Sequence, residues 1–206
     1  MMGTDSTSPA REPEKTKQAI IRAVCSVYDP EIPVLTIEDL GILRFIDVVV
    51  STAEERKYAV KKRTGQSTED DTSSVANPSR PDPSFRAHVV ITPTYAGCPA
   101  METIQTDVVR AARSAGATDV DVELVFSPAW TTDWMSDEGK AKLAAYGVAP
   151  PHGRSDRGSV ALNLAVKCPQ CHSLNTTEVS RFGSTACKAL YRCSDCLEPF
   201  DYFKVH

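Results

Sequence analysis

Two pairs of cysteines in the C-terminal part of the chain have the spacing of metal ligands. Each C-x2-C pair predicts a tight turn whose two sulfurs point at one ion, and the pairs are Cys168 with Cys171 and Cys193 with Cys196. Two such turns supply the four thiolates of a closed, tetrahedral structural zinc site. Four thiolates also suit rubredoxin-type iron, so the residues leave the choice between zinc and iron open. His172 directly follows one turn and is poorly aimed, so it is not included.

A further cysteine, Cys98, lies between a strand-like and a helix-like pattern. Gly97 allows a sharp turn, and Pro99 suits the first helical position because its missing N–H would be unpaired there. The pattern therefore predicts Cys98 at the helix N-cap, where free N–H groups and the helix dipole favour the thiolate that attacks electrophiles and binds metals. The alternative is the commoner role of a cysteine as a small buried hydrophobic side chain.

Two carboxylates and another thiol complete the candidate residues. Asp29 and Glu31 lie in a loop that two prolines stiffen, which suggests a rigid acidic rim beside Cys98 that helps to hold a metal or orient a partner. The alternative is a pair of solvated carboxylates, with Asp29 capping the local backbone. Cys187 precedes a lysine and is a spare ligand, a reactive thiol or filler.

The composition narrows the class of protein. The chain has 206 residues, of which 41% are hydrophobic, enough for one domain with a real core and a small second one. A formal net charge of -4 makes nucleic acid an improbable partner. There is no apolar run of about 20 residues for a membrane helix and no apolar signal-peptide core, so we expect a cytoplasmic protein. Seven cysteines in a reducing compartment indicate metal binding or reactivity rather than disulfides.

A small α+β unit must position Cys98, Asp29 and Glu31. The period-2 alternation from Phe85 to Thr92 predicts a half-buried strand. Thr36 is expected to cap a single turn, and Trp130 and Trp134 either stack on a ligand or fold back over the core. The expected order is helix–strand–strand–helix–strand–helix, with helices over 13–28, 99–115 and 136–147 and strands over 42–50, 85–92 and 120–126.

The remaining segments divide the chain into domains. We expect a disordered N-terminus over 1–12, an α+β domain over 13–151 with a flexible polar insert at 51–84, a linker over 152–159 and a zinc ribbon over 160–206. A domain as small as the ribbon buries little surface, so its ion should supply much of its folding free energy.

The sequence also resembles a known family. Part of the first domain resembles the iron–sulfur assembly domain of SufT-like maturation factors, through Tyr28–Pro33, Thr94–Pro99 and Pro128–Trp130. The tail narrows the resemblance to the PaaD (PaaJ) family, which belongs to bacterial phenylacetyl-CoA epoxidases, through Phe182–Cys193 and Glu198–Lys204. The resemblance covers about residues 13–206, apart from the insert at 51–84.

This resemblance implies an accessory role in phenylacetate catabolism, without substrate turnover of its own. The family is expected to help assemble a metal or iron–sulfur centre in the epoxidase complex. Its implied partners are the oxygenase component, which holds a di-iron centre, and the reductase component, which holds flavin and a [2Fe–2S] cluster. For this chain the resemblance implies that Cys98 transiently holds iron or a cluster, with Asp29 and Glu31 as functional neighbours.

Two other functions are consistent with the residues. One is an enzyme with Cys98 as nucleophile, although His88, on a strand face, has no evident position as its base. The other is a zinc ribbon that binds nucleic acid or protein, against which the acidic composition argues for nucleic acid. The sequence also leaves the oligomeric state open, a homo-oligomer included.

Overall fold

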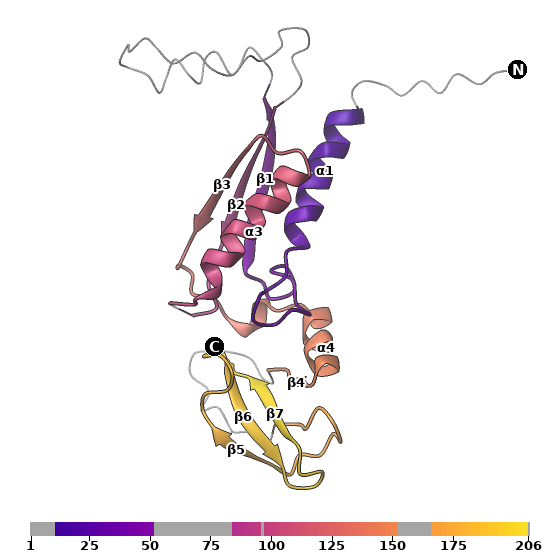
Figure 1. The fold of residues 1–206 in the computed structure, drawn as a ribbon, viewed down its shortest axis with the longest axis vertical. Coiled ribbons are helices and arrows are strands. Elements are labelled where there is room, and N and C mark those ends of the chain that lie inside the picture. The colour runs from indigo at the N-terminus through magenta and orange to yellow at the C-terminus, as the bar shows by residue number, and fades with distance from the viewer. Residues whose placement is uncertain (1–10, 52–83, 96, 152–165, 206) are drawn as a thin grey trace, which may run out of the picture.

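The computed structural model describes residues 11–51, 84–95, 97–151 and 166–205, which form two units (Figure 1). In the first unit, helices α1 and α3 cover a three-stranded sheet, and its elements are α1 (Arg11–Cys25), β1 (Leu43–Ser51), β2 (Ser84–Ile91), α3 (Ala100–Ser114) and β3 (Asp119–Leu124). The strand order is β1-β2-β3, with β1 antiparallel and β3 parallel to β2. A parallel neighbour requires a crossover connection, and α3 provides it.

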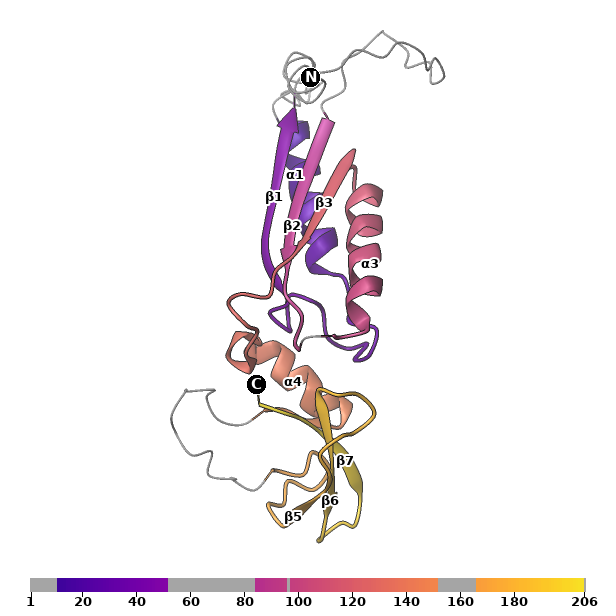
Figure 2. The same cartoon turned by 90° about the vertical axis from the view of Figure 1, so that its left-hand side faces the viewer.

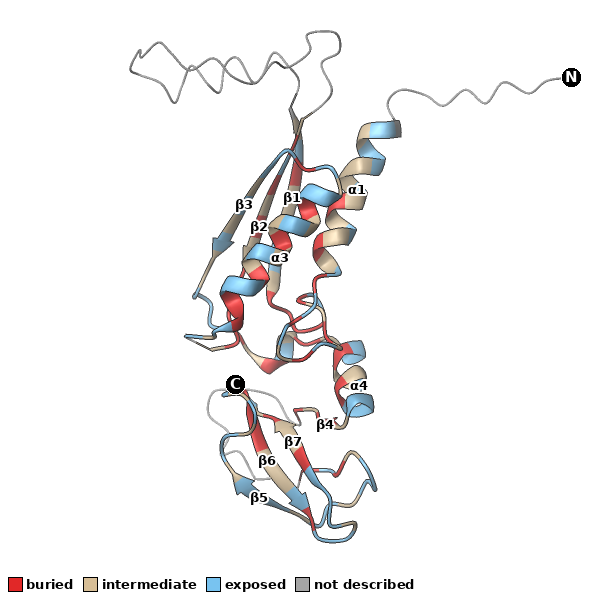
Figure 3. Cartoon of the chain, in the orientation of Figure 1, coloured by how far each residue is buried: buried red, intermediate tan, exposed pale blue. Residues whose placement is uncertain are grey.

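The core lies between this sheet and the two helices, and burial along β2 shows how it forms. Alternate side chains of β2 are buried, as the period-2 pattern predicted, and these are Phe85, Ala87, Val89 and Ile91 (Figure 3). Helix α3 buries Met101, Ile104 and Val108 against them. The predicted strand over 85–92 and the predicted helix over 99–115 are therefore confirmed.

Helix α1 ends earlier than its sequence pattern predicts. Ile20 and Val24 are buried as expected, but the helix stops at Cys25. Tyr28 instead forms an isolated bridge with Thr36, which pulls the chain out of the helix and leaves the Tyr28 ring exposed. The predicted helix over 13–28 therefore extends too far at its C-terminal end, because a tertiary backbone pairing replaces the last helical turn.

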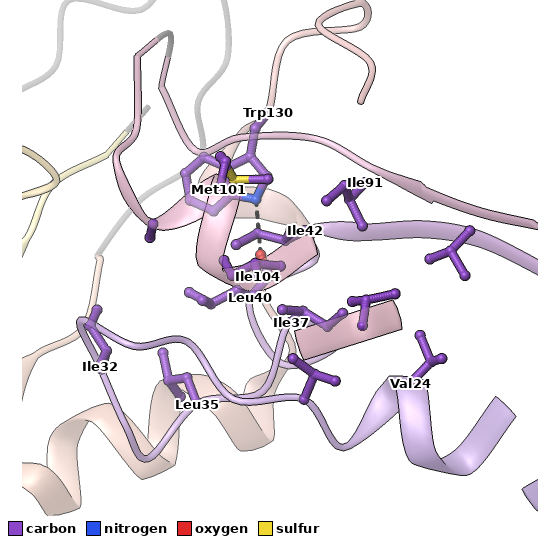
Figure 4. Close-up of a cluster of buried hydrophobic side chains, with 14 of the residues drawn as sticks. Val24, Ile32, Leu35, Ile37, Leu40, Ile42, Ile91, Met101, Ile104 and Trp130 are labelled. Carbon is purple, nitrogen blue, oxygen red and sulfur yellow. Dashed lines mark hydrogen bonds between the residues drawn. The ribbon is translucent and has the colours of Figure 1, made fainter. Parts of the chain in front are cut away.

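The turn that begins at Thr36 lies between α1 and β1 and contacts the segment that follows β3. The Asp39 N–H donates to Thr36 Oγ1 and the Thr36 N–H donates to Asp39 Oδ2, which confirms Thr36 as the cap of this turn. The Trp130 indole N–H donates to the Leu40 carbonyl at 2.9 Å (Figure 4). Trp130 is therefore part of the core, and Trp134 packs against that core with Arg44 over its ring.

The second unit is a four-stranded ribbon that includes a strand from the chain before the predicted linker. After a short 3₁₀ helix (Thr132–Trp134) come α4 (Asp137–Tyr146), β4 (Val148–Ala149), β5 (Thr176–Ser180), β6 (Lys188–Cys193) and β7 (Pro199–Phe203). The strand order is β4-β7-β6-β5, and β4 pairs with β7 in parallel. Helix α4, capped by Ser136 and ended by Gly147 as predicted, lies between the two sheets (Figure 2).

The predicted element order is therefore confirmed for the first unit. The predicted disordered N-terminus over 1–12 lies outside the described residues up to residue 10, whereas residues 11 and 12 belong to α1. Nearly all of the insert at 51–84 and the linker at 152–159 also lie outside the described residues, and the domain boundaries stay predictions. No helix among the described residues is both long and apolar enough to cross a membrane.

Candidate metal and thiol sites

The four paired cysteines converge on one point, at the ends of the ribbon strands. Their sulfurs all lie within 4.8 Å of one another, with 3.8 Å between Cys168 and Cys196 and 3.5 Å between Cys171 and Cys193. A regular tetrahedron with zinc–sulfur bonds of about 2.3 Å has sulfur–sulfur edges of about 3.8 Å. The donor set and its spacing therefore fit one tetrahedral thiophilic ion.

Both cysteine turns contain a residue in the left-handed backbone conformation. The residue after each second cysteine has a positive φ, 65° at His172 and 66° at Leu197. Neither is glycine, and a side chain in this left-handed conformation costs about 1–2 kcal/mol. Backbone N–H groups of Cys196 and Asp195 lower the pKa of Cys193 to about 7, whereas burial and the neighbouring thiols raise the pKa of Cys196 to about 12, so Cys193 is the first of the two to supply a thiolate.

The ribbon packs onto the first unit instead of standing apart. Phe203 at the end of β7 is buried in the same cluster as Ile104 of α3, and its ring meets Trp130 edge-on at 6.0 Å. Cys187, just before β6, is buried in this cluster too. The ribbon thus closes the end of the first unit where Cys98, Asp29 and Glu31 lie.

The acidic loop at Asp29 is more buried than a solvated rim. Asp29 is 7% exposed, and its Oδ1 accepts the N–H groups of Glu31 at 2.8 Å and Ile32 at 2.9 Å. Burial raises the pKa of Asp29 above its usual range, while these N–H groups and Lys188 oppose the rise. Asp29 therefore both caps the local backbone and places a buried negative charge near the ribbon.

Cys98 lies on the turn before α3, but not as the sequence predicts. The helix begins at Ala100 with Pro99 as its N-cap, although the Ala100 N–H still donates to the Cys98 sulfur. Burial raises the pKa of the Cys98 thiol, and the carboxylates of Glu31 and Asp29 raise it further. The prediction that this position stabilises the Cys98 thiolate is therefore wrong, because desolvation and nearby negative charge outweigh the hydrogen bond from Ala100.

The structure brings Cys187 and Lys188 into the same neighbourhood as this loop. Burial raises the pKa of Cys187, and Glu31 raises it too, while Thr185 and Lys188 oppose the rise. Burial, then Cys98, Glu31 and Cys187, raise the pKa of Tyr95 to about 12. These effects link residues of the acidic loop, the turn before α3 and the start of β6 in one partly buried cluster.

Sequence reasoning did not select two members of this cluster, Tyr95 and Lys188. Tyr95 lies within the Thr94–Pro99 segment, and its hydrogen bond with Cys98 could have been suspected from that closeness in sequence. Lys188 is buried, with its Nζ 3.6 Å from Asp201 Oδ2. In the sequence, the only signal for Lys188 was its position directly after Cys187.

His88 does not complete a catalytic thiol site. His88 lies on the open face of the sheet, opposite α3, where its Nδ1 is 3.2 Å from Asp121 Oδ2 and its Nε2 is 3.5 Å from Glu123 Oε2. It therefore cannot serve as the base for Cys98, which lies on the helix-covered side. Cys25 is half-buried, and burial with the nearby Glu38 raises its pKa to about 11, as suits an unreactive thiol.

Comparison with known proteins agrees with the four-cysteine ribbon. Residues 153–204 match the family model of the PaaD zinc beta ribbon domain. The chain is 42% identical over 178 residues to the PaaD protein of Escherichia coli K12, whose name assigns it to a "Putative 1,2-phenylacetyl-CoA epoxidase", and the match covers 86% of each chain. The chain therefore belongs to the PaaD family of phenylacetyl-CoA epoxidase components.

Two further similarities each cover about two thirds of the chain. The chain is 30% identical over 130 residues to a Porphyromonas gingivalis protein named "Fe-S protein maturation auxiliary factor", covering 63% of this chain and 91% of that protein. A solved structure of a DUF59 domain from Bacillus anthracis is 20% identical, with a TM-score of 0.40, over 65% of this chain and 96% of that one.

Proposed function

We propose that this protein is an accessory maturation factor of phenylacetyl-CoA epoxidase. It assists assembly of the metal or iron–sulfur centre in the oxygenase or reductase component, in the cytoplasm, without turnover of its own. The similarity to PaaD of E. coli supports the epoxidase context, and the similarity to the P. gingivalis maturation factor supports the assembly role.

The observation that carries the proposal is the pairing of a protonated thiol with carboxylates. Burial raises the pKa of Cys98 most, and the carboxylates of Glu31 and Asp29 raise it further, which makes the thiol a poor nucleophile near neutral pH. The same negative charges attract a cation. The electrostatics thus disfavour the thiol enzyme and favour a site for a metal ion.

The raised pKa also accounts for transient binding. A cation must displace the thiol proton to bind the sulfur, so binding is coupled to proton release and is weakened near neutral pH. A weakened site can pass its cargo on, whereas a preformed thiolate would hold it more firmly. In this proposal Cys98 carries iron or a cluster briefly, and its carboxylate neighbours compensate the positive charge.

The ribbon has a different role in the proposal. Its cysteines Cys168, Cys171, Cys193 and Cys196 hold a structural zinc ion, supported by the sulfur spacing and the match to a zinc ribbon family. Bound zinc would hold the two cysteine turns together and thereby keep β6 and β7 docked on the first unit. The ribbon then also provides a surface for the client component.

The test is client metallation under anaerobic conditions. The oxygenase and reductase components are co-expressed with the wild-type protein, with Cys98→Ser, or with Cys25→Ser as a matched control away from the site. We expect Cys98→Ser to lower the iron content of the client and the epoxidase activity, and Cys25→Ser to preserve both. Fully metallated, active epoxidase with Cys98→Ser would refute the proposal.

A further inference from the structure

The two cysteine turns of the ribbon are joined to each other by hydrogen bonds. Both oxygens of the Asp195 carboxylate, in the second turn, accept from residues that follow the first turn. Oδ2 accepts from the Ser173 hydroxyl, and Oδ1 accepts from the Asn175 side-chain amide at 2.8 Å. The Asn175 carbonyl accepts the Ser194 N–H at 2.8 Å. These hydrogen bonds connect the two turns without involving the sulfurs.

The residues at the two ends of this connection also contact the ligand sulfurs. The Ser173 N–H donates to the Cys171 sulfur, and the Asp195 N–H donates to the Cys193 sulfur. These two sulfurs, one from each turn, are 3.5 Å apart. The side-chain bond from Ser173 to Asp195 therefore joins the two residues that each orient one of these sulfurs.

The connection lies on the surface of the ribbon, and its geometry is set by further bonds. Ser173 Oγ accepts the Asn175 N–H at 2.9 Å while it donates to the carboxylate. Hydrogen bonds to a carboxylate are roughly twice as strong as those between neutral groups. Asp195 is exposed, however, so water and salt weaken the contact. We therefore expect an effect on metal binding near the lower end of the range for outer-shell partners, about 10-fold.

We propose that Asp195 is a positioning residue of the four-cysteine site, whose carboxylate cross-links the two cysteine turns and so holds Cys171 and Cys193 at the separation that one tetrahedral ion requires. The inference rests on the zinc site of the proposed function and extends that site beyond its four ligands. A cross-link that exists before the ion binds reduces the conformational freedom that binding has to remove. Asp195 should therefore raise the affinity of the ribbon for zinc without contacting the ion.

Glu198 provides a matched control for Asp195. Glu198 follows Cys196 by two residues, as Asp195 follows Cys193, and its N–H likewise donates to the sulfur of that cysteine. Its carbonyl accepts the Cys193 N–H at 3.0 Å. The backbone makes both bonds, so they survive replacement of the side chain by alanine. Glu198→Ala thus removes a carboxylate at the equivalent position of the other pair and leaves the bonds between the turns in place.

The test is competition for zinc between the full chain and a chromophoric chelator. We expect Asp195→Ala to raise the zinc dissociation constant about 10-fold and Glu198→Ala to leave it unchanged. Asp195→Asn keeps one acceptor oxygen for the Ser173 hydroxyl and should recover part of the lost affinity. Co²⁺ in place of zinc gives a second measurement, because its d–d absorption reports the coordination geometry. That absorption should change in Asp195→Ala and match the wild type in Glu198→Ala.

A double-mutant cycle tests whether Asp195 acts through Ser173. The combined loss of affinity in Ser173→Ala with Asp195→Ala should be smaller than the sum of the two single losses, because both variants remove the same bond. Additive losses would overturn the inference. Tryptophan emission checks folding, and if Asp195→Ala is unfolded, Ser173→Ala decides: weaker zinc binding with native emission supports the cross-link, and unchanged binding overturns it.

The remaining outcomes separate this inference from the proposed function. If Asp195→Ala and Glu198→Ala bind zinc equally tightly, the positioning role is overturned and the structural zinc site stands. If the wild type binds no zinc, the structural zinc site and this inference both fail. The maturation role is measured independently, by client metallation with Cys98→Ser.

Discussion

Replacing Phe203 by alanine tests whether the ribbon and the first unit stabilise each other. Phe203 is 1% exposed, and its ring meets that of Trp130 edge-on with centroids 6.0 Å apart and planes at 64°. Burying a phenylalanine in a core is worth about 3–5 kcal/mol against alanine, and an aromatic pair accounts for about 0.5–1.5 kcal/mol of such a loss. Because the ring lies at the junction of the ribbon and the first unit and not in the centre of one unit, we expect a loss near the lower value, about 3 kcal/mol.

The loss can be measured by urea unfolding of the zinc-loaded protein, followed by tryptophan fluorescence. The chain has two tryptophans, Trp130 and Trp134, and both belong to the first unit. Their emission therefore reports whether Phe203 still covers Trp130. Phe182→Ala is the matched control, because the Phe182 ring is 69% exposed and contacts the Lys204 ammonium at 4.9 Å. An exposed cation–π contact is worth about 0.5–1 kcal/mol.

A clear result would refute this reasoning. If Phe203→Ala loses no more stability than Phe182→Ala and leaves the tryptophan emission unchanged, the packing of the ribbon on the first unit contributes nothing to stability. The ribbon would then be an independent module, and the burial of Cys187 would need another cause.

Three further substitutions give separate tests. Burial raises the pKa of Asp39, but Lys142 and the Thr36 N–H lower it more. The Asp39 charge should therefore stabilise the fold above about pH 4, and this stabilisation should be lost as the pH falls through the lower folded pKa. Asp39→Asn should reduce the fall of the urea midpoint with decreasing pH in this range. The pKa of Asp29 is raised in the folded state, so its charge destabilises the fold at any pH above that pKa. Asp29→Asn should therefore raise the urea midpoint at pH 7, while it lowers client metallation. A lower urea midpoint for Asp29→Asn would contradict this reasoning. Leu197→Gly should raise the stability of the zinc-loaded ribbon by about 0.5–1 kcal/mol in thermal unfolding, because relief of the positive φ exceeds the entropy cost of glycine.

The sequence predicted most of the fold because its signals are local. Alternation along β2 and the caps of α4, Ser136 and Gly147, depend on neighbouring residues and were confirmed. The end of α1 was misplaced, because the bridge between Tyr28 and Thr36 is a contact that helical periodicity does not encode.

The convergence of the four paired cysteines also followed from the sequence. A C-x2-C spacing folds both sulfurs of a pair towards one point by turn geometry alone, and the structure brings the two pairs together within 4.8 Å. The docking of the ribbon through Phe203 did not follow, since nothing near this residue specifies a partner as distant as Trp130.

What the sequence determined by itself is therefore which residues could do chemistry, namely the ribbon cysteines and Cys98 with its acidic loop. Only the tertiary structure decided the protonation of Cys98 and placed Cys187 near the same carboxylates. The physical reason is that a thiol loses its proton according to the water and charges around it, and at this site chain folding supplies the burial and the carboxylates from segments remote in sequence.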